Sequence, residues 1–204
     1  MHKEIFTKEQ LELLPLIKEF GRKFVLVGGT AIALHIGHRR SIDFDLFSYK
    51  GFKNKIIKNK ISRCHKINKT FTDEPGAYTI FINGIKTTFY HYPYQIEAAI
   101  RLDKSPLKLP DLLTLSAMKA FALSRRPKWK DYVDLYFIVK NHYSVGEISE
   151  KAKEIFQGEF NERIFREALV YFADVSYAEP VEYMKGFEVS DKAIEKELIK
   201  FSLS

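Results

Sequence analysis

Two aspartates, Asp43 and Asp45, occur one residue apart in the segment SIDFDLF. Because side chains alternate along a β-strand, a strand here would direct both carboxylates to one face and Ile42, Phe44 and Leu46 to the other. Two neighbouring carboxylates repel each other unless a cation lies between them. Oxygen ligands favour Mg²⁺, which usually binds one or two carboxylates together with substrate phosphates. Asp43 and Asp45 are therefore the candidate metal ligands and catalytic residues.

A pair of glycines, Gly28 and Gly29, follows the apolar run FVLV, and Thr30 comes next. Glycine lets the backbone turn sharply and approach a ligand without a Cβ clash. A helix that starts at Thr30 would direct its free N–H groups and the positive end of its dipole to the same place, which favours a phosphate. Either motif alone is typical of an ordinary turn or of a solvated strand face. Their order and spacing together predict binding of a metal-bound nucleoside triphosphate by Gly28, Gly29 and Thr30.

The basic loop between these motifs, Gly37 to Ser41, adds further candidates. Arg39 or Arg40 could approach the phosphates or an RNA backbone, and a plain surface role stays open for at least one of them. Ser41 is interpreted either as a loop-capping residue or as a nucleotide ligand. We count Arg39 and Ser41 among the predicted nucleotide-binding residues.

Charged residues also recur in the segment AMKAFALSRRPKWKDYVDLYFI, where Pro127 separates two predicted helices. Lys130 and Asp134 are four residues apart, so they could form an ordinary surface ion pair worth less than about 1 kcal/mol. Asp131 could simply favour the start of the second helix. Asp134, however, lies in the apolar run from Val133 to Val139, where an isolated charge would be costly. We therefore expect Asp134 to have a partner.

GGT followed after about ten residues by SIDFDLF resembles the first motif of the DNA polymerase β nucleotidyltransferase superfamily. The form GGTAIALHIGHRRSIDFDLF is most similar to the AbiEii/AbiGii family, the nucleotidyltransferase-like toxins of type IV toxin–antitoxin systems. The later segment is similar to a second family motif, which is matched by Lys119, Arg126, Lys130, Asp131 and Asp134. The resemblance implies that Lys119, as a catalytic residue, and Arg126 neutralise triphosphate charge. Lys130 would do the same or hold the two aspartates, and these either contact the nucleotide or orient the basic groups.

The elements around the motifs predict an α+β protein. Residues 1–106 are expected to form a polymerase β-like nucleotidyltransferase core, a mixed sheet flanked by helices, and residues 107–204 a helical bundle. A capping box of Thr7 and Gln10 starts a helix through Phe20, with Leu11, Leu14 and Ile17 as its apolar positions. Asn83-Gly84 predicts a β-hairpin that extends the sheet beside the Asp-bearing strand.

Many active polymerase β-like enzymes have a third carboxylate on such a later strand. The corresponding stretch here, Lys86 to Phe89, has no acid. Either another acid such as Glu97 supplies the charge, or two carboxylates suffice, or catalysis is weakened or lost.

Composition narrows the setting. The 204 residues carry a net charge of +7 and a pI near 9.3, which favours an anionic partner, although a lysine-rich proteome would produce the same bias. The single cysteine, Cys64, excludes an internal disulfide and a cysteine-ligated zinc site. No run approaches the ~20 apolar residues of a membrane span. The expectation is a cytoplasmic protein without a membrane partner.

The leading interpretation is a Mg²⁺-dependent nucleotidyltransferase that transfers a nucleoside monophosphate from a nucleoside triphosphate to an acceptor hydroxyl. The family resemblance implies RNA, with tRNA the first candidate, as the acceptor, and a cognate antitoxin as a partner. The alternative is a catalytically weak or inactive protein of the same fold that binds nucleotide or RNA. Transfer to a small molecule is a third possibility, and a Ser or Cys hydrolase is disfavoured because Gly-x-Ser-x-Gly is absent.

Overall fold

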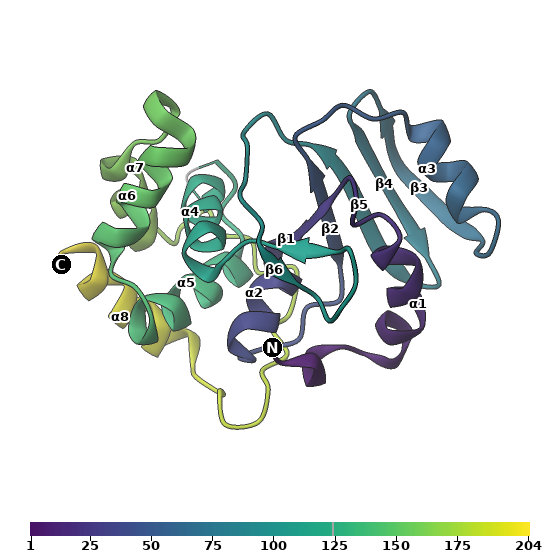
Figure 1. Ribbon diagram of the computed structural model, residues 1–204. Helices are drawn as coiled ribbons and strands as arrows, with labels where there is room; N and C mark the ends of the chain where they lie inside the picture. Colours follow the sequence, from purple (N-terminus) through teal and green to yellow (C-terminus); the bar gives the residue numbers. More distant parts are fainter. Residues whose placement is uncertain (124) are drawn as a thin grey trace. The chain divides into compact units, whose positions relative to one another are not determined.

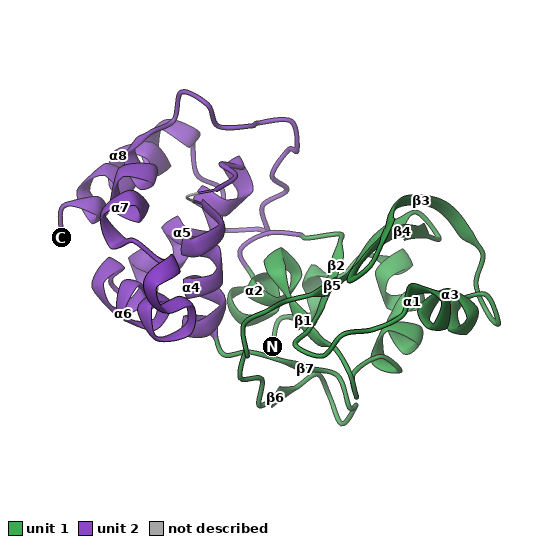
Figure 2. Cartoon of the chain, turned by 90° about the horizontal axis from the view of Figure 1, so that it is seen from above, with its two compact units in different colours: residues 1–37, 41–111 green, residues 38–40, 112–204 purple. Residues whose placement is uncertain are grey.

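The computed structural model describes residues 1–123 and 125–204, and the chain divides into two compact units (Figure 2). Unit 1 comprises Met1–Gly37 and Ser41–Asp111, and unit 2 comprises His38–Arg40 and Leu112–Ser204. This division differs from the predicted boundary after residue 106 in two ways. The sheet of unit 1 gains a strand at Lys108–Leu109, and three residues of the basic loop belong to the helical unit.

Unit 1 is built on a seven-stranded mixed sheet with the order β3-β4-β5-β2-β1-β7-β6. The strands are β1 (Val25–Val27), β2 (Phe44–Ser48), β3 (Ile67–Glu74), β4 (Ala77–Ile82), β5 (Ile85–His91), β6 (Ile100–Arg101) and β7 (Lys108–Leu109). The Asp-bearing strand β2 is antiparallel to β1 and parallel to β5. The predicted hairpin is confirmed, because β4 and β5 are joined at Asn83 and Gly84, which both have positive φ as a primed turn requires.

Each central strand has one buried face and one half-exposed face. Burial alternates along β2, β4 and β5, as expected for a sheet covered on one side. On the buried face the rings of Phe20, Phe24 and Phe89 pack against one another with centroids 4.9 to 6.3 Å apart. Lys60, on the helix α3 (Asn54–Ile61), donates to the backbone oxygen of Glu19, just after the helix α1 (Lys8–Lys18), so these two helices are neighbours (Figure 1).

The helix predicted near the N-terminus is confirmed with its capping box, since Thr7 and Gln10 bond reciprocally at the start of α1. Leu14 and Ile17 are buried as predicted, whereas Leu11 is exposed and Leu13 and Leu16 are buried instead. Unit 1 also contains the short 3₁₀ segment η1 (Lys3–Ile5) and the helix α2 (Gly28–Ile36).

Unit 2 is a bundle of helices. They are α4 (Leu112–Leu123), α5 (Trp129–Asn141), α6 (Val145–Phe156), η2 (Gln157–Glu159), α7 (Glu162–Val170) and α8 (Asp191–Ser202). Side-chain N-caps at Ser144, Asn161 and Ser190 start the last three α-helices. The rings of Phe121 and Phe156 stack with centroids 3.9 Å apart, which joins α4 to α6. Among the described residues, no helix is both long enough and apolar enough to cross a membrane.

Candidate active site

The carboxylate of Asp45 lies directly against the start of α2. A Cβ added at Gly28 would be 2.2 Å from Asp45 Oδ2, so no other residue fits at position 28 without displacing the carboxylate. The backbone there is also left-handed, with φ of +72°, which glycine tolerates. The helix itself begins at Gly28 rather than at Thr30 as predicted, so Gly28, Gly29 and Thr30 all lie in its first turn. The free N–H groups of this turn and the Asp45 carboxylate therefore share one place.

The loop before β2 is held by two buried polar side chains. The Thr30 hydroxyl lies 2.5 Å from the backbone oxygen of Asp43 and 3.1 Å from that of Ser41. The amide of Gln10 donates to the same Ser41 oxygen at 2.9 Å. Both side chains are buried, so Thr30 contributes its hydroxyl to the loop while its backbone N–H remains in the first turn of α2. Ser41 is buried at the same place, and Ile42, predicted on the apolar face, is exposed because β2 begins only at Phe44.

Asp43 has a cation beside it. Its Oδ2 lies 3.8 Å from Lys86 Nζ, and both side chains are 38% exposed. The parallel register pairs Asp45 with Thr88 on β5, so the strand that could supply a third carboxylate presents a threonine and a lysine here. Within residues 1–123 and 125–204, no group of three His, Cys, Asp or Glu side chains could hold a metal ion. Two carboxylates remain, and their hard oxygen atoms suit Mg²⁺ when phosphate oxygens complete the coordination.

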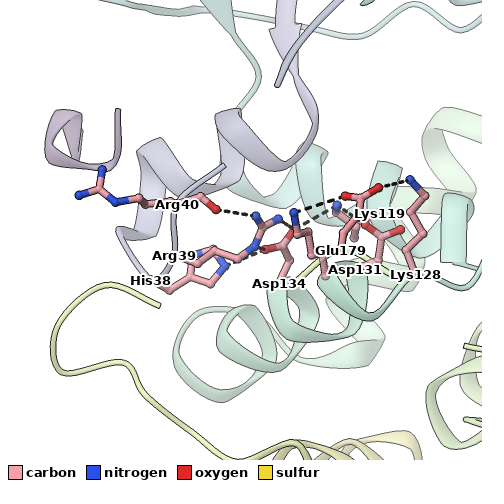
Figure 3. A network of polar contacts seen from close by, with 9 residues as sticks. His38, Arg39, Arg40, Lys119, Lys128, Asp131, Asp134 and Glu179 are labelled. Carbon is pink, nitrogen blue, oxygen red and sulfur yellow. Dashed lines mark hydrogen bonds and ion pairs between the residues drawn. The ribbon is translucent and has the colours of Figure 1, made fainter. Parts of the chain in front are cut away.

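Unit 2 contains a buried charge cluster around Asp134 (Figure 3). Arg39 donates from Nε to Asp134 Oδ1 at 2.7 Å and from Nη2 to Oδ2 at 2.8 Å, a bidentate pair. Lys119 Nζ lies 3.0 Å from Asp134 Oδ2 and 2.6 Å from Asp131 Oδ1. The expectation that Asp134 has a partner is confirmed. Arg39 and Lys119 balance Asp131 and Asp134, so the cluster is neutral when His38 is neutral.

His38 completes the cluster as a neutral imidazole. Its Nε2 lies 2.7 Å from Asp134 Oδ1, whereas its Nδ1 is buried and has no partner among the described residues. A proton on Nδ1 would have no acceptor, so the neutral tautomer with Nε2–H donating to Asp134 fits best. Burial lowers the pKa of His38 and outweighs the opposite effect of Asp134.

The two charged groups that flank Asp134 shift its titration in the other sense. Burial alone would raise the pKa of Asp134, but the charges of Arg39 and Lys119 hold it well below its ordinary value. Burial likewise disfavours the charged form of Lys119, but Asp131 and Asp134 raise its pKa above the ordinary value. The cluster is thus fully ionised, apart from His38, at neutral pH.

The remaining family-matching residues of unit 2 lie nearer the surface. Lys130 and Lys128 both contact Glu179, at 3.3 and 2.9 Å, and the contact with Lys128, ahead of the charge of Lys130, lowers the pKa of Glu179 to about 2. Lys130 therefore pairs with Glu179 rather than with Asp134, four residues further along its helix. Arg126 is exposed.

Residues 176–184 connect the parts of unit 2 that carry these groups. Backbone hydrogen bonds join Ser176 to Pro127 and Trp129, and join Glu182 and Met184 to Arg40 and His38. Arg40 also pairs with the side chain of Glu182 at 2.7 Å. These bonds explain why residues 38–40 belong to the helical unit.

The structure therefore gathers the predicted site residues in two sets. The set in unit 1 consists of Gly28, Gly29, Thr30, Ser41, Asp43 and Asp45. The set in unit 2 consists of Arg39, Lys119, Arg126, Lys130, Asp131 and Asp134. Arg39, predicted to bind nucleotide, is only 2% exposed and its guanidinium is bound by Asp134. Sequence reasoning missed the parts played by Gln10 and His38, since neither matches a motif, although the burial of Gln10 could have been suspected from its place in the capping box.

The sheet and the glycine turn against an aspartate strand define the class of protein, a nucleotidyltransferase fold. JHP933 from Helicobacter pylori has a similar structure, with a TM-score of 0.61 and 18% identity over 97% of this chain and 92% of that chain. MenT4, a nucleotidyltransferase toxin from Mycobacterium tuberculosis, has a TM-score of 0.60 and 15% identity over 95% and 79% of the two chains. The predicted α+β fold class is confirmed.

The sequence identifies the family within this class. The model of the nucleotidyl transferase AbiEii toxin, of type IV toxin–antitoxin systems, matches residues 16–196. An uncharacterized protein from Aquifex aeolicus (strain VF5) is 30% identical over 179 residues, which are 82% of this chain and 83% of the relative. The chain belongs to the AbiEii toxin family of nucleotidyltransferases, as its motifs predicted.

Proposed function

We propose that this chain transfers a nucleoside monophosphate from a Mg²⁺-bound nucleoside triphosphate to a hydroxyl group of RNA, with a tRNA-like acceptor first, as the toxin of a toxin–antitoxin pair. In this reaction the acceptor oxygen forms a bond to the α-phosphorus and the bond to pyrophosphate breaks. The hydroxyl proton leaves to solvent or to a carboxylate.

The observation that carries the proposal is the approach of Asp45 to Gly28. The Asp45 carboxylate occupies the space of a side chain at the first residue of α2, where the helix directs its N–H groups outward. Triphosphate oxygens bound by these N–H groups would be next to the carboxylates of Asp45 and Asp43. Mg²⁺ bound by these carboxylates and the phosphates would neutralise charge that develops on the leaving pyrophosphate.

The chain's own groups supply positioning. Thr30 and Gln10 hold the backbone of the loop from Ser41 to Asp43, which orients Asp43 before any ligand binds. Ser41 takes part through its backbone oxygen. Such preorganisation lowers the cost of assembling the site in the transition state.

In unit 2 the proposed roles follow from the family motif. Asp131 and Asp134 hold Lys119 charged, and Lys119 and the exposed Arg126 are the groups proposed to neutralise triphosphate charge. Lys130 is proposed to bind phosphate by exchanging Glu179 for it. Arg39 acts as a positioning residue, because its guanidinium is buried against Asp134.

The family description supports a toxin and an antitoxin partner, and MenT4 is named as a nucleotidyltransferase toxin. A specific observation favours a second candidate function, nucleotide or RNA binding without turnover. Position 88, opposite Asp45, is a threonine, and Lys86 places a positive charge beside Asp43 where an acid would assist catalysis. Glu97, the acid suggested as a substitute, is exposed and lies outside the strands.

The test is transfer of label from each α-labelled nucleoside triphosphate, with Mg²⁺, to total RNA and to small-molecule pools. We expect RNA labelling by the native chain and its loss in Asp43→Asn and Asp45→Asn, which keep the shape of each side chain. Asp73→Asn, on β3, is the matched control and should retain activity. Glu97→Gln tests the substitute acid.

Absence of transfer by the native chain, with triphosphate binding that still depends on Asp43 and Asp45, would replace this proposal by the binding function. Transfer to small molecules alone would reject the RNA acceptor.

A further inference from the structure

A row of aromatic rings continues from the aspartates along the half-exposed face of the sheet. Phe47 follows Asp45 by two residues on β2, so both side chains are on one face and about 7 Å apart along the strand. The parallel register pairs Phe47 with Tyr90 on β5, and their ring centroids are 5.3 Å apart. Tyr92 lies 5.0 Å from Phe47, and Tyr94 lies 5.2 Å from Tyr92. We name Phe47, Tyr90, Tyr92 and Tyr94 the aromatic row.

Backbone pairing holds the aromatic row in place beyond the end of β5. The Tyr92 N–H donates to the backbone oxygen of Ser48 at 2.9 Å, so the chain continues to follow β2 after His91. Cross-strand aromatic pairs stabilise sheets by themselves, but they are normally buried on one side. Tyr90 is 40% exposed and therefore presents ring surface to a ligand.

The same face bears further groups suited to a polyanion. Phe81 on β4 is opposite Lys86, its ring lies 5.0 Å from that of Phe71, and Lys69 Nζ lies 4.5 Å from the Phe71 centroid. Unit 1 has 17 Lys and Arg against 11 Asp and Glu, a net charge of +6, while the whole chain has +7. Nearly all of the positive excess thus belongs to the unit that carries the aromatic row.

We infer that the aromatic row is a stacking platform for the unpaired bases of a single-stranded RNA segment whose hydroxyl is directed to Asp43 and Asp45. Aromatic side chains that follow one another along a basic surface bind single strands because every base has a face that stacks on a ring. A duplex has its bases stacked already, so it gains nothing from the platform. The inference rests on the proposed function for the direction of the strand, but the binding itself requires neither metal nor nucleotide.

The experiment measures binding of a fluorescent oligouridylate of about 12 nucleotides by anisotropy, without triphosphate and with a chelator present. The variants are Tyr90→Ala, which removes the ring, and Tyr90→Phe, which keeps it. The matched control is Tyr171→Ala, because Tyr171 is 57% exposed and belongs to unit 2. Thermal melting of every variant shows whether it is folded.

We expect Tyr90→Ala to weaken single-strand binding about tenfold, the loss of one stacked base, with an unchanged dependence on salt because no phosphate contact is removed. Tyr90→Phe and Tyr171→Ala should bind like the native chain, and a duplex of equal length should bind more weakly. Equal affinities of native and Tyr90→Ala, tight binding of the duplex, or no oligonucleotide binding by the native chain would each overturn the inference. The last result would fit a face that docks a protein instead.

Failure of the proposed function is distinguishable from failure of this inference. Loss of label transfer in every assay, with oligonucleotide binding still dependent on Tyr90, rejects only the enzyme. RNA labelling that depends on Asp43, with binding indifferent to Tyr90, rejects only the platform.

Discussion

The charges of unit 2 and those of unit 1 differ in how much water reaches them. Asp134 is fully buried, and Arg39, Lys119 and His38 approach it to 2.7 to 3.0 Å. Asp43 and Lys86 are 3.8 Å apart and each is 38% exposed. Motif reasoning placed Asp43 and Asp134 together as site residues, yet their surroundings are opposite.

The difference teaches which aspartate is free to change partners. A carboxylate out of water needs all its compensation from the protein, so removing one partner of a buried pair costs about 3–5 kcal/mol. An exposed pair contributes at most about 1 kcal/mol, because water replaces either partner. Asp134 is therefore expected to shape unit 2, whereas Asp43 can exchange Lys86 for a ligand.

The largest expected effect is that of Asp134→Asn. It leaves the buried charges of Arg39 and Lys119 without a full counter-charge, so we expect the free energy of unfolding to fall by about 3–5 kcal/mol. Denaturant unfolding followed by circular dichroism measures it. Asp43→Asn is the control and should change stability by less than about 0.5 kcal/mol. Equal losses in the two variants would remove the contrast between the units.

The second prediction asks whether unit 1 is equally tolerant at its backbone. Gly28→Ala and Gly84→Ala both place a Cβ at positive φ, +72° and +79°, at a cost of roughly 1–2 kcal/mol. Only at Gly28 does the Cβ meet a side chain, Asp45, while Gly84 has open space. Gly28→Ala should therefore be the more destabilising and should also abolish triphosphate binding. Matching losses of stability and full binding by Gly28→Ala would show that Asp45 is not held there.

The third prediction uses pH to separate the members of the buried cluster. The pKa of His38 is lowered in the folded chain, so the unfolded chain binds a proton that the folded chain does not. Stability is complete above the ordinary His pKa of about 6.5 and falls as the pH decreases below it, by at most about 1.4 kcal/mol per pH unit.

Unfolding curves between pH 7 and pH 5 measure this slope, and His38→Gln should flatten it. Asp134, whose pKa is lowered, contributes stability that is lost only below about pH 4. A native chain with no slope between pH 7 and pH 5 would mean that His38 is charged in the cluster.

The smallest expected effect is that of Lys86→Met. Because its pair with Asp43 is exposed, stability should change by less than about 1 kcal/mol. Removing a competing cation should raise the affinity for Mn²⁺ a few-fold, to be measured by electron paramagnetic resonance of free Mn²⁺. Lys66→Met, also in unit 1, controls for the change in net charge. Unchanged Mn²⁺ affinity would indicate that Lys86 and the metal do not compete for Asp43.

Features that depend on neighbours in the sequence were predicted well. The capping boxes of Thr7 with Gln10 and Ser144 with Glu147 form as predicted, since each joins residues three positions apart. The start of α2 was predicted two residues late, because the Gly-Gly pair reads as a turn until Asp45 is known to require Gly28 inside the helix.

The sequence by itself determined the family, the α+β class, the alternation that places Asp45 and Phe47 on one face, and the need of Asp134 for a counter-charge. Only the tertiary structure decided that this counter-charge comes from Arg39, 95 residues away, and that Lys130 binds Glu179 instead. The physical reason is that a buried charge states that it needs a partner through its apolar neighbours in the sequence. Which cation meets it depends on how the chain returns, through residues 176–184, to bind both the 38–40 and the 127–129 segments.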